Sequence, residues 1–171
     1  LLRYLALFFL VALVMYMVVA IVGAAETIMQ GTKESGRVHH REDGQFGVFV
    51  PLTEKETAQI TEKGVTLQMD FSLDFHLGQS TFRVYQARES VDLFVPAEGE
   101  EIPAQGEILL EQHYAEKHEL QLGDIFIVGG KEFTVAGIGS TPDYDAAFEK
   151  TSDTTVDSNL FGFGFVTAED Y

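Results

Sequence analysis

The most constraining feature of the sequence is a stretch of 22 residues without a charged side chain, from Tyr4 to Ala25. Leu, Val, Phe, Ala and Met make up most of it. A bilayer core about 30 Å thick is crossed by roughly 20 helical residues, and a single segment satisfies its main-chain polar groups there only as a helix. We therefore predict a transmembrane helix within residues 1–25.

A cleavable signal peptide is the alternative interpretation of this stretch. The small residues of Val22–Ala25 have the spacing of a cleavage site. The apolar region of a signal peptide is usually about 7–15 residues long, however, and this one is longer. We therefore expect a retained membrane helix.

Arg3 is the charged residue that precedes the apolar stretch, and basic residues favour the cytoplasmic side of a membrane. We expect the N-terminus in the cytoplasm and the chain after about residue 25 on the extracellular or periplasmic side of the cell membrane. The sequence does not begin with Met and stops at Tyr171 without an obvious end. We expect it to be a fragment, so that further membrane spans can come after it.

Composition excludes several classes of function. The formal net charge is −16, and such a surface repels the phosphates of nucleic acids. The acidity by itself indicates solubility, and it leaves a cationic ligand or partner open. There are no cysteines, which excludes disulfides, thiolate zinc sites and cysteine nucleophiles.

The rest of the chain predicts one α+β domain with a mainly antiparallel sheet and short helices. Residues 26–44 are polar and contain three glycines, which is typical of a stalk or linker, and residues 45–171 form the domain. Thr53 and Glu56 make a capping box for a helix over residues 54–63. The other expected elements are strands at 45–51, 65–76, 80–87, 107–110, 125–128, 131–138 and 160–167, a helix at 111–119, and a long acidic loop at 139–159.

The clearest periodicity covers residues 65–76, where apolar and polar residues alternate over twelve positions. The pattern predicts a long strand with one buried and one solvated face, and hence an antiparallel sheet. Gly129-Gly130 has the chemistry of a two-residue hairpin turn. The glycines of the last strand, Gly162 and Gly164, indicate a bulge.

The histidines do not form a metal-binding pattern. His39 and His40 are adjacent, so their side chains diverge. His113 and His118 would lie about 140° apart on a helix. His76 is expected on the exposed face of its strand, and no HExxH motif is present.

The acidic loop has a partial likeness to an EF-hand calcium loop. Asp143 and Asp145 occupy the first and third positions, and Ala147 the fifth. Phe148 stands where glycine is required, and Thr154 stands where glutamate is required. The likeness fails, and we interpret 142–158 as a solvated acidic loop, with cation or partner binding there left open.

No other motif carries chemistry. The glycines of "GIGSTP" and "GFGFVT" lack a dinucleotide-binding pattern, "GGKE" lacks the first glycine and the Ser or Thr of a phosphate-binding loop, and there is no GxSxG. We therefore expect no catalytic residue, no bound cofactor, no metal and no enzymatic activity in this chain.

An ordered set of short motifs resembles the extracellular core domain of MacB/FtsX-like ABC transporter permeases. The loop "EGEEIP" at Glu98–Pro103 comes first. The other motifs are Glu107-Ile108, Tyr114-Ala115, Leu122-Gly123-Asp124, the hairpin Val128–Gly137, "TPDYDAAF" at 141–148 and "FGFGFVTAEDY" at 161–171. Helices of the family often end on Gly or Asn at the place where this chain has His118-Glu119. The resemblance covers nearly the whole chain and is strongest from Glu98 to Tyr171.

The resemblance implies a MacB-like periplasmic core domain that continues beyond the fragment. It implies a permease subunit that couples ATP hydrolysis, on a partner ABC ATPase subunit or a fused domain, to export or envelope remodelling. The implied partners are that ATPase, the lipid bilayer and a second permease copy or homologue, with no nucleic acid. The transported substrate, the direction of transport and the number of further helices stay open.

A second hypothesis from a different class is a single-pass, membrane-anchored acidic binding module. Its acidic face would capture a cationic peptide or Ca²⁺ outside the cell. The two hypotheses differ in the chain expected beyond Tyr171, because a permease needs further membrane spans there and a binding module needs none.

Overall fold

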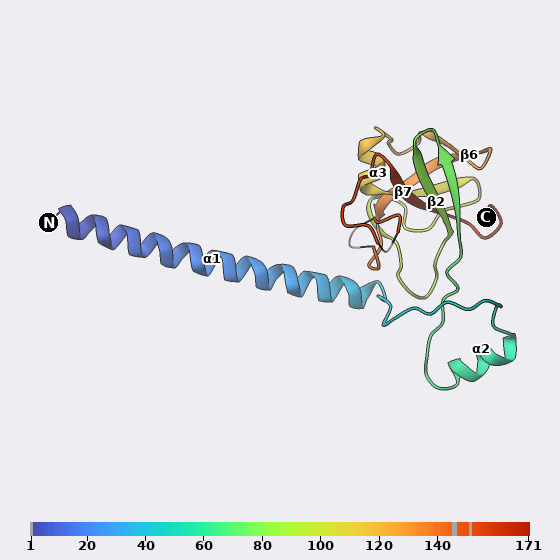
Figure 1. Ribbon diagram of the computed structural model, residues 1–171, viewed down its shortest axis with the longest axis horizontal. Coiled ribbons are helices and arrows are strands. Elements are labelled where there is room, and N and C mark those ends of the chain that lie inside the picture. The colour runs from blue at the N-terminus through green and yellow to red at the C-terminus, as the bar shows by residue number, and fades with distance from the viewer. Residues whose placement is uncertain (1, 145–146, 151) are drawn as a thin grey trace. The chain divides into compact units, whose positions relative to one another are not determined.

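The computed structural model describes residues 2–144, 147–150 and 152–171. The chain divides into two compact units, Leu1–Val38 and His39–Tyr171 (Figure 1). Each unit is described by itself below.

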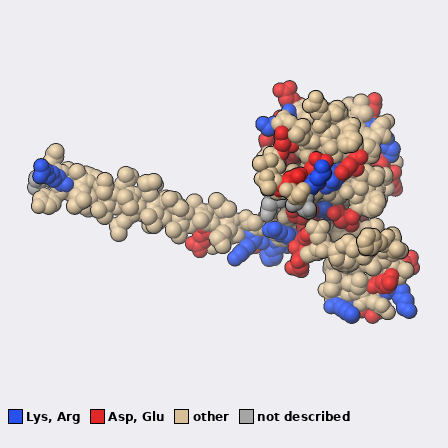
Figure 2. Space-filling model, in the orientation of Figure 1, with Lys and Arg blue, Asp and Glu red and all other residues tan. Residues whose placement is uncertain are grey.

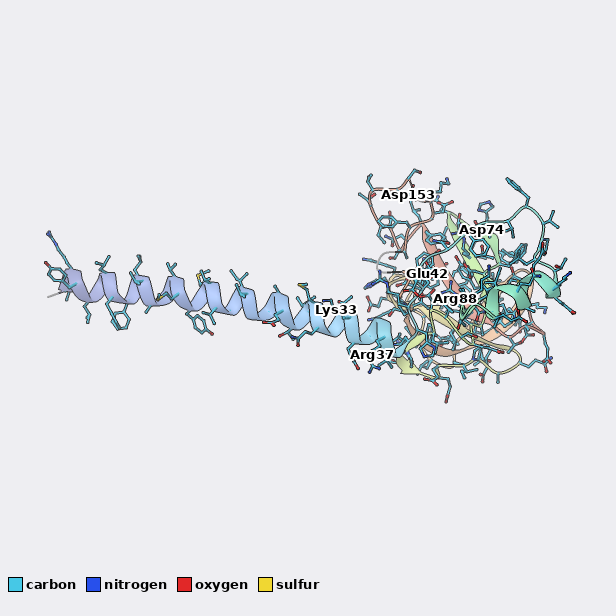
Figure 3. All side chains as sticks on the ribbon, turned by 90° about the horizontal axis from the view of Figure 1, so that it is seen from below. Lys33, Arg37, Glu42, Asp74, Arg88 and Asp153 are labelled. Atoms are coloured by element: carbon cyan, nitrogen blue, oxygen red, sulfur yellow. The ribbon has the colours of Figure 1, made fainter. Side chains whose placement is uncertain are left out.

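The first unit is one helix, α1 (Leu2–Val38). By length and apolar composition it can cross a membrane, a property that it shares with signal sequences, and Figure 2 shows its long uncharged stretch. The predicted apolar helix is therefore confirmed. The helix also continues through most of the predicted linker, where Arg37 pairs with Glu34 at 2.6 Å. Figure 3 labels Lys33 and Arg37 on this polar part.

In the described residues, the second unit comprises a seven-stranded mixed sheet and two short helices. Its elements are α2 (Glu54–Thr61), β1 (Ser72–Leu77), β2 (Ser80–Gln86), β3 (Val95–Gly99), β4 (Glu107–Glu111), α3 (Gln112–Lys117), β5 (Ile125–Val128), β6 (Lys131–Ser140) and β7 (Phe161–Val166). The strand order is β1-β2-β7-β4-β6-β3, and β5 also pairs with β6. The α+β class is thus confirmed, and the sheet is mixed because β2–β7 and β4–β6 are parallel pairs.

The central strands are covered on both faces, which differs from the expected sheet with one solvated face. Alternate residues of β2, β4 and β7 enter two apolar clusters. The first cluster contains Tyr114 and Ala115 of α3, and the second contains Phe94 and Ala147 from loops. Strands buried on both sides have continuous apolar sequences, as "ILL" in β4 does.

The glycines of β7 make room for aromatic rings and do not form a bulge. All six residues of β7 pair in regular register with β2. A Cβ atom at Gly162 would lie 2.2 Å from ring carbons of Tyr114, and one at Gly164 would lie 2.9 Å from the ring of Phe82. The predicted strand is confirmed, and the predicted bulge is wrong because the glycines serve side-chain packing.

The segment between the first unit and β1 departs most from the predictions. The strand expected at 45–51 is absent, and residues 46–50 are exposed. Helix α2 has the predicted capping box, in which Thr53 N donates to Glu56 Oε2 at 2.9 Å. The twelve-residue strand is paired only from Ser72 onward. Residues 65–71 lack the strand partner that the pattern requires, and their apolar side chains are therefore not buried.

The hairpin at Gly129-Gly130 and the turn around Gly123 form as predicted. Gly129 and Gly130 have φ of 60° and 79°, the positive values that a primed turn requires. Asp124 Oδ2 accepts a hydrogen bond from Gln121 N at 2.8 Å and so closes the turn around Gly123.

Helix α3 ends in a Schellman motif that has glutamate at the glycine position. Leu120 N donates to Ala115 O at 2.9 Å, and Glu119 N points to Glu116 O at 3.4 Å. Glu119 has a φ of 55°, a left-handed conformation that glycine adopts without strain. The C-terminal end of α3 is therefore strained at Glu119. Helices of the family that the sequence resembles often have Gly or Asn at this place.

We predict that Glu119→Gly stabilises the domain by about 1 kcal/mol, because it removes the left-handed strain. The matched control is Glu116→Gly inside the same helix, which should destabilise the domain by about 1 kcal/mol. Urea unfolding of the full chain in detergent, followed by near-ultraviolet circular dichroism of the tyrosines, measures both. A destabilised Glu119→Gly variant would contradict the assignment.

Candidate functional site

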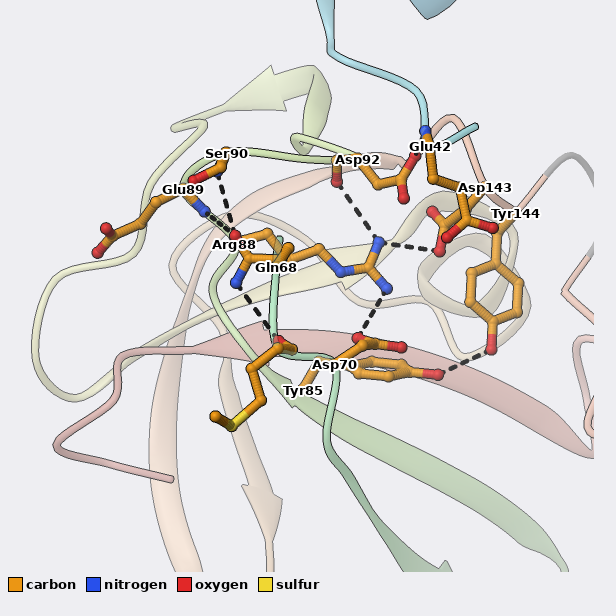
Figure 4. Close-up of polar contacts among 11 residues, drawn as sticks. Glu42, Gln68, Asp70, Tyr85, Arg88, Glu89, Ser90, Asp92, Asp143 and Tyr144 are labelled. Carbon is orange, nitrogen blue, oxygen red and sulfur yellow. Dashed lines mark hydrogen bonds and ion pairs between the residues drawn. The ribbon is translucent and has the colours of Figure 1, made fainter. Parts of the chain in front are cut away.

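The candidate site is the Arg88 cluster, which we define as Arg88 with the carboxylates of Glu42, Asp70, Asp92 and Asp143 (Figure 4). Arg88 comes shortly after β2, and its side chain is only 4% exposed. Its guanidinium donates to Asp143 Oδ2 at 2.9 Å and to Asp70 Oδ1 at 3.1 Å. The cluster therefore joins segments that are far apart in the chain.

Two aromatic rings lie beneath the guanidinium. Its central carbon is 5.3 Å from the ring centre of Tyr85 and 5.4 Å from that of Phe165. The Tyr85 hydroxyl is hydrogen bonded to the Tyr144 hydroxyl at 2.8 Å. Burial raises the pKa of Tyr85, so this phenol stays neutral. The cation is thus packed on the second apolar cluster and bonded at its rim, an arrangement typical of arginine.

The cluster has more carboxylates than cations. Burial, followed by the charges of Asp92 and Asp143, raises the pKa of Glu42. Burial also raises the pKa of Asp92, against the hydrogen bond from the Glu42 main chain. The Oδ1 atom of Asp143 is buried and has no hydrogen-bond partner among the described residues. One guanidinium therefore does not compensate all four acids, and the charged forms of Glu42 and Asp92 are disfavoured.

The first residues after α1 are bonded to the cluster, and we call residues 39–42 the strap. Leu93 N donates to His39 O and Asp92 N donates to His40 O, both at 3.0 Å. Glu42 N donates to Asp92 Oδ1 at 2.9 Å. Asp92 has a φ of 50°, which the Asp side chain tolerates better than most. The strap thus ties the chain that leaves α1 to the loop 88–93.

The segment that leads into β1 is bonded to the same loop from another direction. Gln68 Oε1 accepts hydrogen bonds from Glu89 N at 3.3 Å and Ser90 N at 3.2 Å. Asp70 reaches Arg88 from this segment, as Figure 4 shows. The loop 88–93 is therefore a joint at which the strap, the approach to β1 and the loop after β6 meet.

The histidines singled out in the sequence are not brought together. His40 Nδ1 lies 2.9 Å from Ser90 O in the joint, and His118 stacks on Tyr114. His113 and His76 are exposed on other elements, as predicted for His76. Within residues 2–144, 147–150 and 152–171 no group of His, Asp and Glu has the arrangement of a metal site.

The acidic loop reaches the site through one of its residues. Asp143 binds Arg88, and Ala147 is buried in the second apolar cluster. Asp145 lies outside the described residues.

The sequence analysis did not single out Arg88 as a site residue. Of the 27 acidic and 11 basic residues, two and three precede His39, which leaves 25 and 8 in the second unit. In so acidic a domain each arginine next to an apolar strand is a candidate ion-pair partner, and that signal could have found it.

We predict that Arg88→Met destabilises the domain by about 3 kcal/mol, because Asp143 is left buried without its counter-ion. Adding Asp143→Asn should restore part of the loss, since the uncompensated charge is removed. Arg37→Met is the matched control, because its ion pair with Glu34 is exposed to solvent and its loss should change the free energy of unfolding little. Urea unfolding of the full chain measures all three, and equal effects of Arg88→Met and Arg37→Met would contradict the cluster's role.

The raised pKa values of Glu42 and Asp92 predict a pH dependence of the joint. A carboxyl group whose pKa is higher in the folded than in the unfolded state stabilises the fold at acidic pH, and this contribution is lost as pH rises through the folded pKa. The strap should therefore open more readily at pH 7 than at pH 4.

The variant Glu42→Gln/Asp92→Asn removes both titrations and keeps an oxygen acceptor at position 92. The amides of Glu42, Asp92 and Leu93, which donate the hydrogen bonds of the strap, should exchange more slowly than those of the wild type at pH 7, and the difference should vanish near pH 4. Hydrogen exchange, corrected for the intrinsic pH effect, gives the comparison. A pH-independent difference between the two proteins would contradict the prediction.

Comparison of the chain with protein-family models, with curated proteins and with solved structures yields no significant match. The geometry of the joint and the order of motifs along the sequence are therefore the basis for a functional proposal.

Proposed function

We propose that this chain comprises the first membrane helix and the outer domain of a MacB/FtsX-like ABC transporter permease. In this proposal it couples ATP hydrolysis on a partner ATPase to export or to remodelling of the envelope. The observation that carries the proposal is the strap. The apolar helix α1 continues as helix to Val38, and the next four residues are hydrogen bonded into the outer domain.

A connection of this kind suits a coupling function. A permease that works on an outer domain has to transmit a displacement of its membrane helix, and a long flexible linker would absorb it. Two main-chain hydrogen bonds and one to the side chain of Asp92 attach the strap directly after the helix. The ordered motifs from Glu98 to Tyr171 supply the second line of support.

The proposed arrangement assigns a place to each part. The N-terminus is cytoplasmic, α1 spans the cell membrane, and the domain is extracellular or periplasmic. The proposed partners are the bilayer, an ABC ATPase that supplies the energy, and a second permease copy or homologue. The chain itself transmits the mechanical output and carries no catalytic group in this scheme.

We predict that a flexible five-residue Gly/Ser insertion between Val38 and His39 uncouples the transporter. In the complete transporter the ATPase should still assemble and hydrolyse ATP, while substrate movement or the envelope phenotype falls by at least about tenfold, because slack before the strap absorbs the motion. The matched control is the same insertion between Gly44 and Gln45, after the strap, where it should have little effect.

Equal activity of the two insertion variants would overturn the coupling role of the strap. The permease assignment itself is tested by the length of the reading frame, which should encode three or more spans after Tyr171 beside or fused to an ATPase. A protein that ends near Tyr171 with a single span would instead favour the anchored binding module. Calorimetric titration with Ca²⁺ and cationic peptides would then test that module.

A further inference from the structure

Between the strap and β1 the chain makes an excursion that starts and ends at the joint, and we call residues 43–67 the protrusion. On one side of it Glu42 N donates to Asp92 Oδ1 at 2.9 Å, and on the other Gln68 Oε1 accepts a hydrogen bond from Ser90 N at 3.2 Å. No residue of the protrusion is buried. The joint therefore holds the protrusion at its base, and the protrusion adds no buried residue to either apolar cluster.

A short apolar loop lies near the start of the protrusion, and we define it as residues 45–50. It is neither helix nor strand. Phe49 is fully exposed, and the exposed fractions of Phe46, Val48 and Val50 are 62%, 52% and 74%. Single exposed apolar residues are ordinary on a protein surface, but four within five positions form a patch of the kind that marks a protein or membrane contact. Because the loop takes no part in the core, folding of the domain does not explain its composition.

The distribution of charge favours a bilayer as the surface that covers this loop. Residues 45–53 contain no charged side chain. The protrusion has four acidic and two basic residues, whereas the rest of residues 39–171 has 21 acidic and six basic ones. Phospholipid surfaces are neutral or negative, so they repel most of this domain but not the protrusion. A basic protein partner would instead be attracted to the acidic remainder of the domain.

The chain is long enough for the loop to reach the bilayer in which α1 would lie. The apolar stretch ends at Ala25, and the helical residues 26–38 add about 20 Å at 1.5 Å per residue. Phe49 comes after Glu42 by a length of chain that spans about 24 Å when extended. Within the described residues no hydrogen bond holds residues 44–50 to the sheet. A tether of this length keeps the loop at a high local concentration near the membrane.

We propose that the apolar loop inserts into the interfacial region of the bilayer that holds α1. The rings of Phe46 and Phe49 enter the boundary between headgroups and acyl chains, while the main chain of the loop stays at the depth where water satisfies its polar groups. In the proposed function only α1 contacts the bilayer, and the loop gives the outer domain a second contact. This inference rests on the proposed function in one respect, which is that α1 is retained in the membrane.

Tryptophan fluorescence tests this contact, because the chain has no tryptophan of its own. The full chain with Phe49→Trp is reconstituted into vesicles of phosphatidylcholine and phosphatidylglycerol, in which lipids brominated in their acyl chains quench an indole at the headgroup boundary. We expect at least about twofold quenching and blue-shifted emission, since the ring leaves water for the interface. The matched control is Ile102→Trp, at a residue that is 70% exposed in another part of the domain, and it should be quenched little.

Adding Val48→Asp to Phe49→Trp tests whether the apolar character of the loop causes the contact. The change places a carboxylate in the loop, so the quenching should fall to the level of the Ile102→Trp control. Val48 is exposed, so the substitution leaves the core intact. Equal quenching of Phe49→Trp and Ile102→Trp would overturn the inference. So would an indole at position 49 that is shielded only in the complete transporter, which would assign the loop to a protein partner.

Tyr16→Trp, in the middle of the apolar stretch, reports on α1 in the same vesicles. Quenching of Tyr16→Trp without quenching of Phe49→Trp would overturn the contact of the loop and leave the proposed function standing. Absence of quenching at both positions would overturn the membrane placement of α1, and with it both proposals.

Discussion

The buried guanidinium of Arg88 is the interaction on which the organisation of the outer domain depends. It binds Asp70 before β1 and Asp143 after β6, and it is packed on Tyr85 and Phe165 of the central strands. A charge with 4% of its side chain exposed requires partners, and those partners fix the segments that carry them. The loop that begins at Arg88 then receives the strap and so fixes the entry of the chain into the domain.

The sheet separates an apolar interior from polar contacts at its margin. β4 and β7 are buried on both faces, and Gly162 and Gly164 admit the rings of Tyr114 and Phe82. Charge is placed at the margin, as in the Asp74–Arg83 pair, whose arginine lies 5.1 Å from the ring centre of Phe161. The strand β1, which carries Asp74, is therefore held by an ion pair on one face and by the packing of Phe75 and Leu77 against the first apolar cluster on the other.

Local signals predicted local structure well. The capping box at Thr53, the primed turn at Gly129-Gly130 and the turn at Gly123 depend on a few neighbouring residues, and each is confirmed. The strand at 45–51 is absent, and the long strand is paired only from Ser72, because a strand also needs a partner along its edge. The predicted bulge in β7 is wrong, because its glycines make room for aromatic rings of α3 and β2, which are distant in the sequence.

The sequence alone determined the apolar helix, the α+β class, the hairpins and the absence of recognised catalytic motifs, because these depend on composition and on spacing over a few residues. It could not determine which arginine becomes buried, since Arg88, Asp70 and Asp143 are up to 73 positions apart and meet only through the sheet order. The tertiary structure also decided the parallel pairings β2–β7 and β4–β6. It also left residues 65–71 outside the strand that the alternation predicts, because a period of two separates the side chains into two rows, but a strand forms only where a partner strand pairs with it.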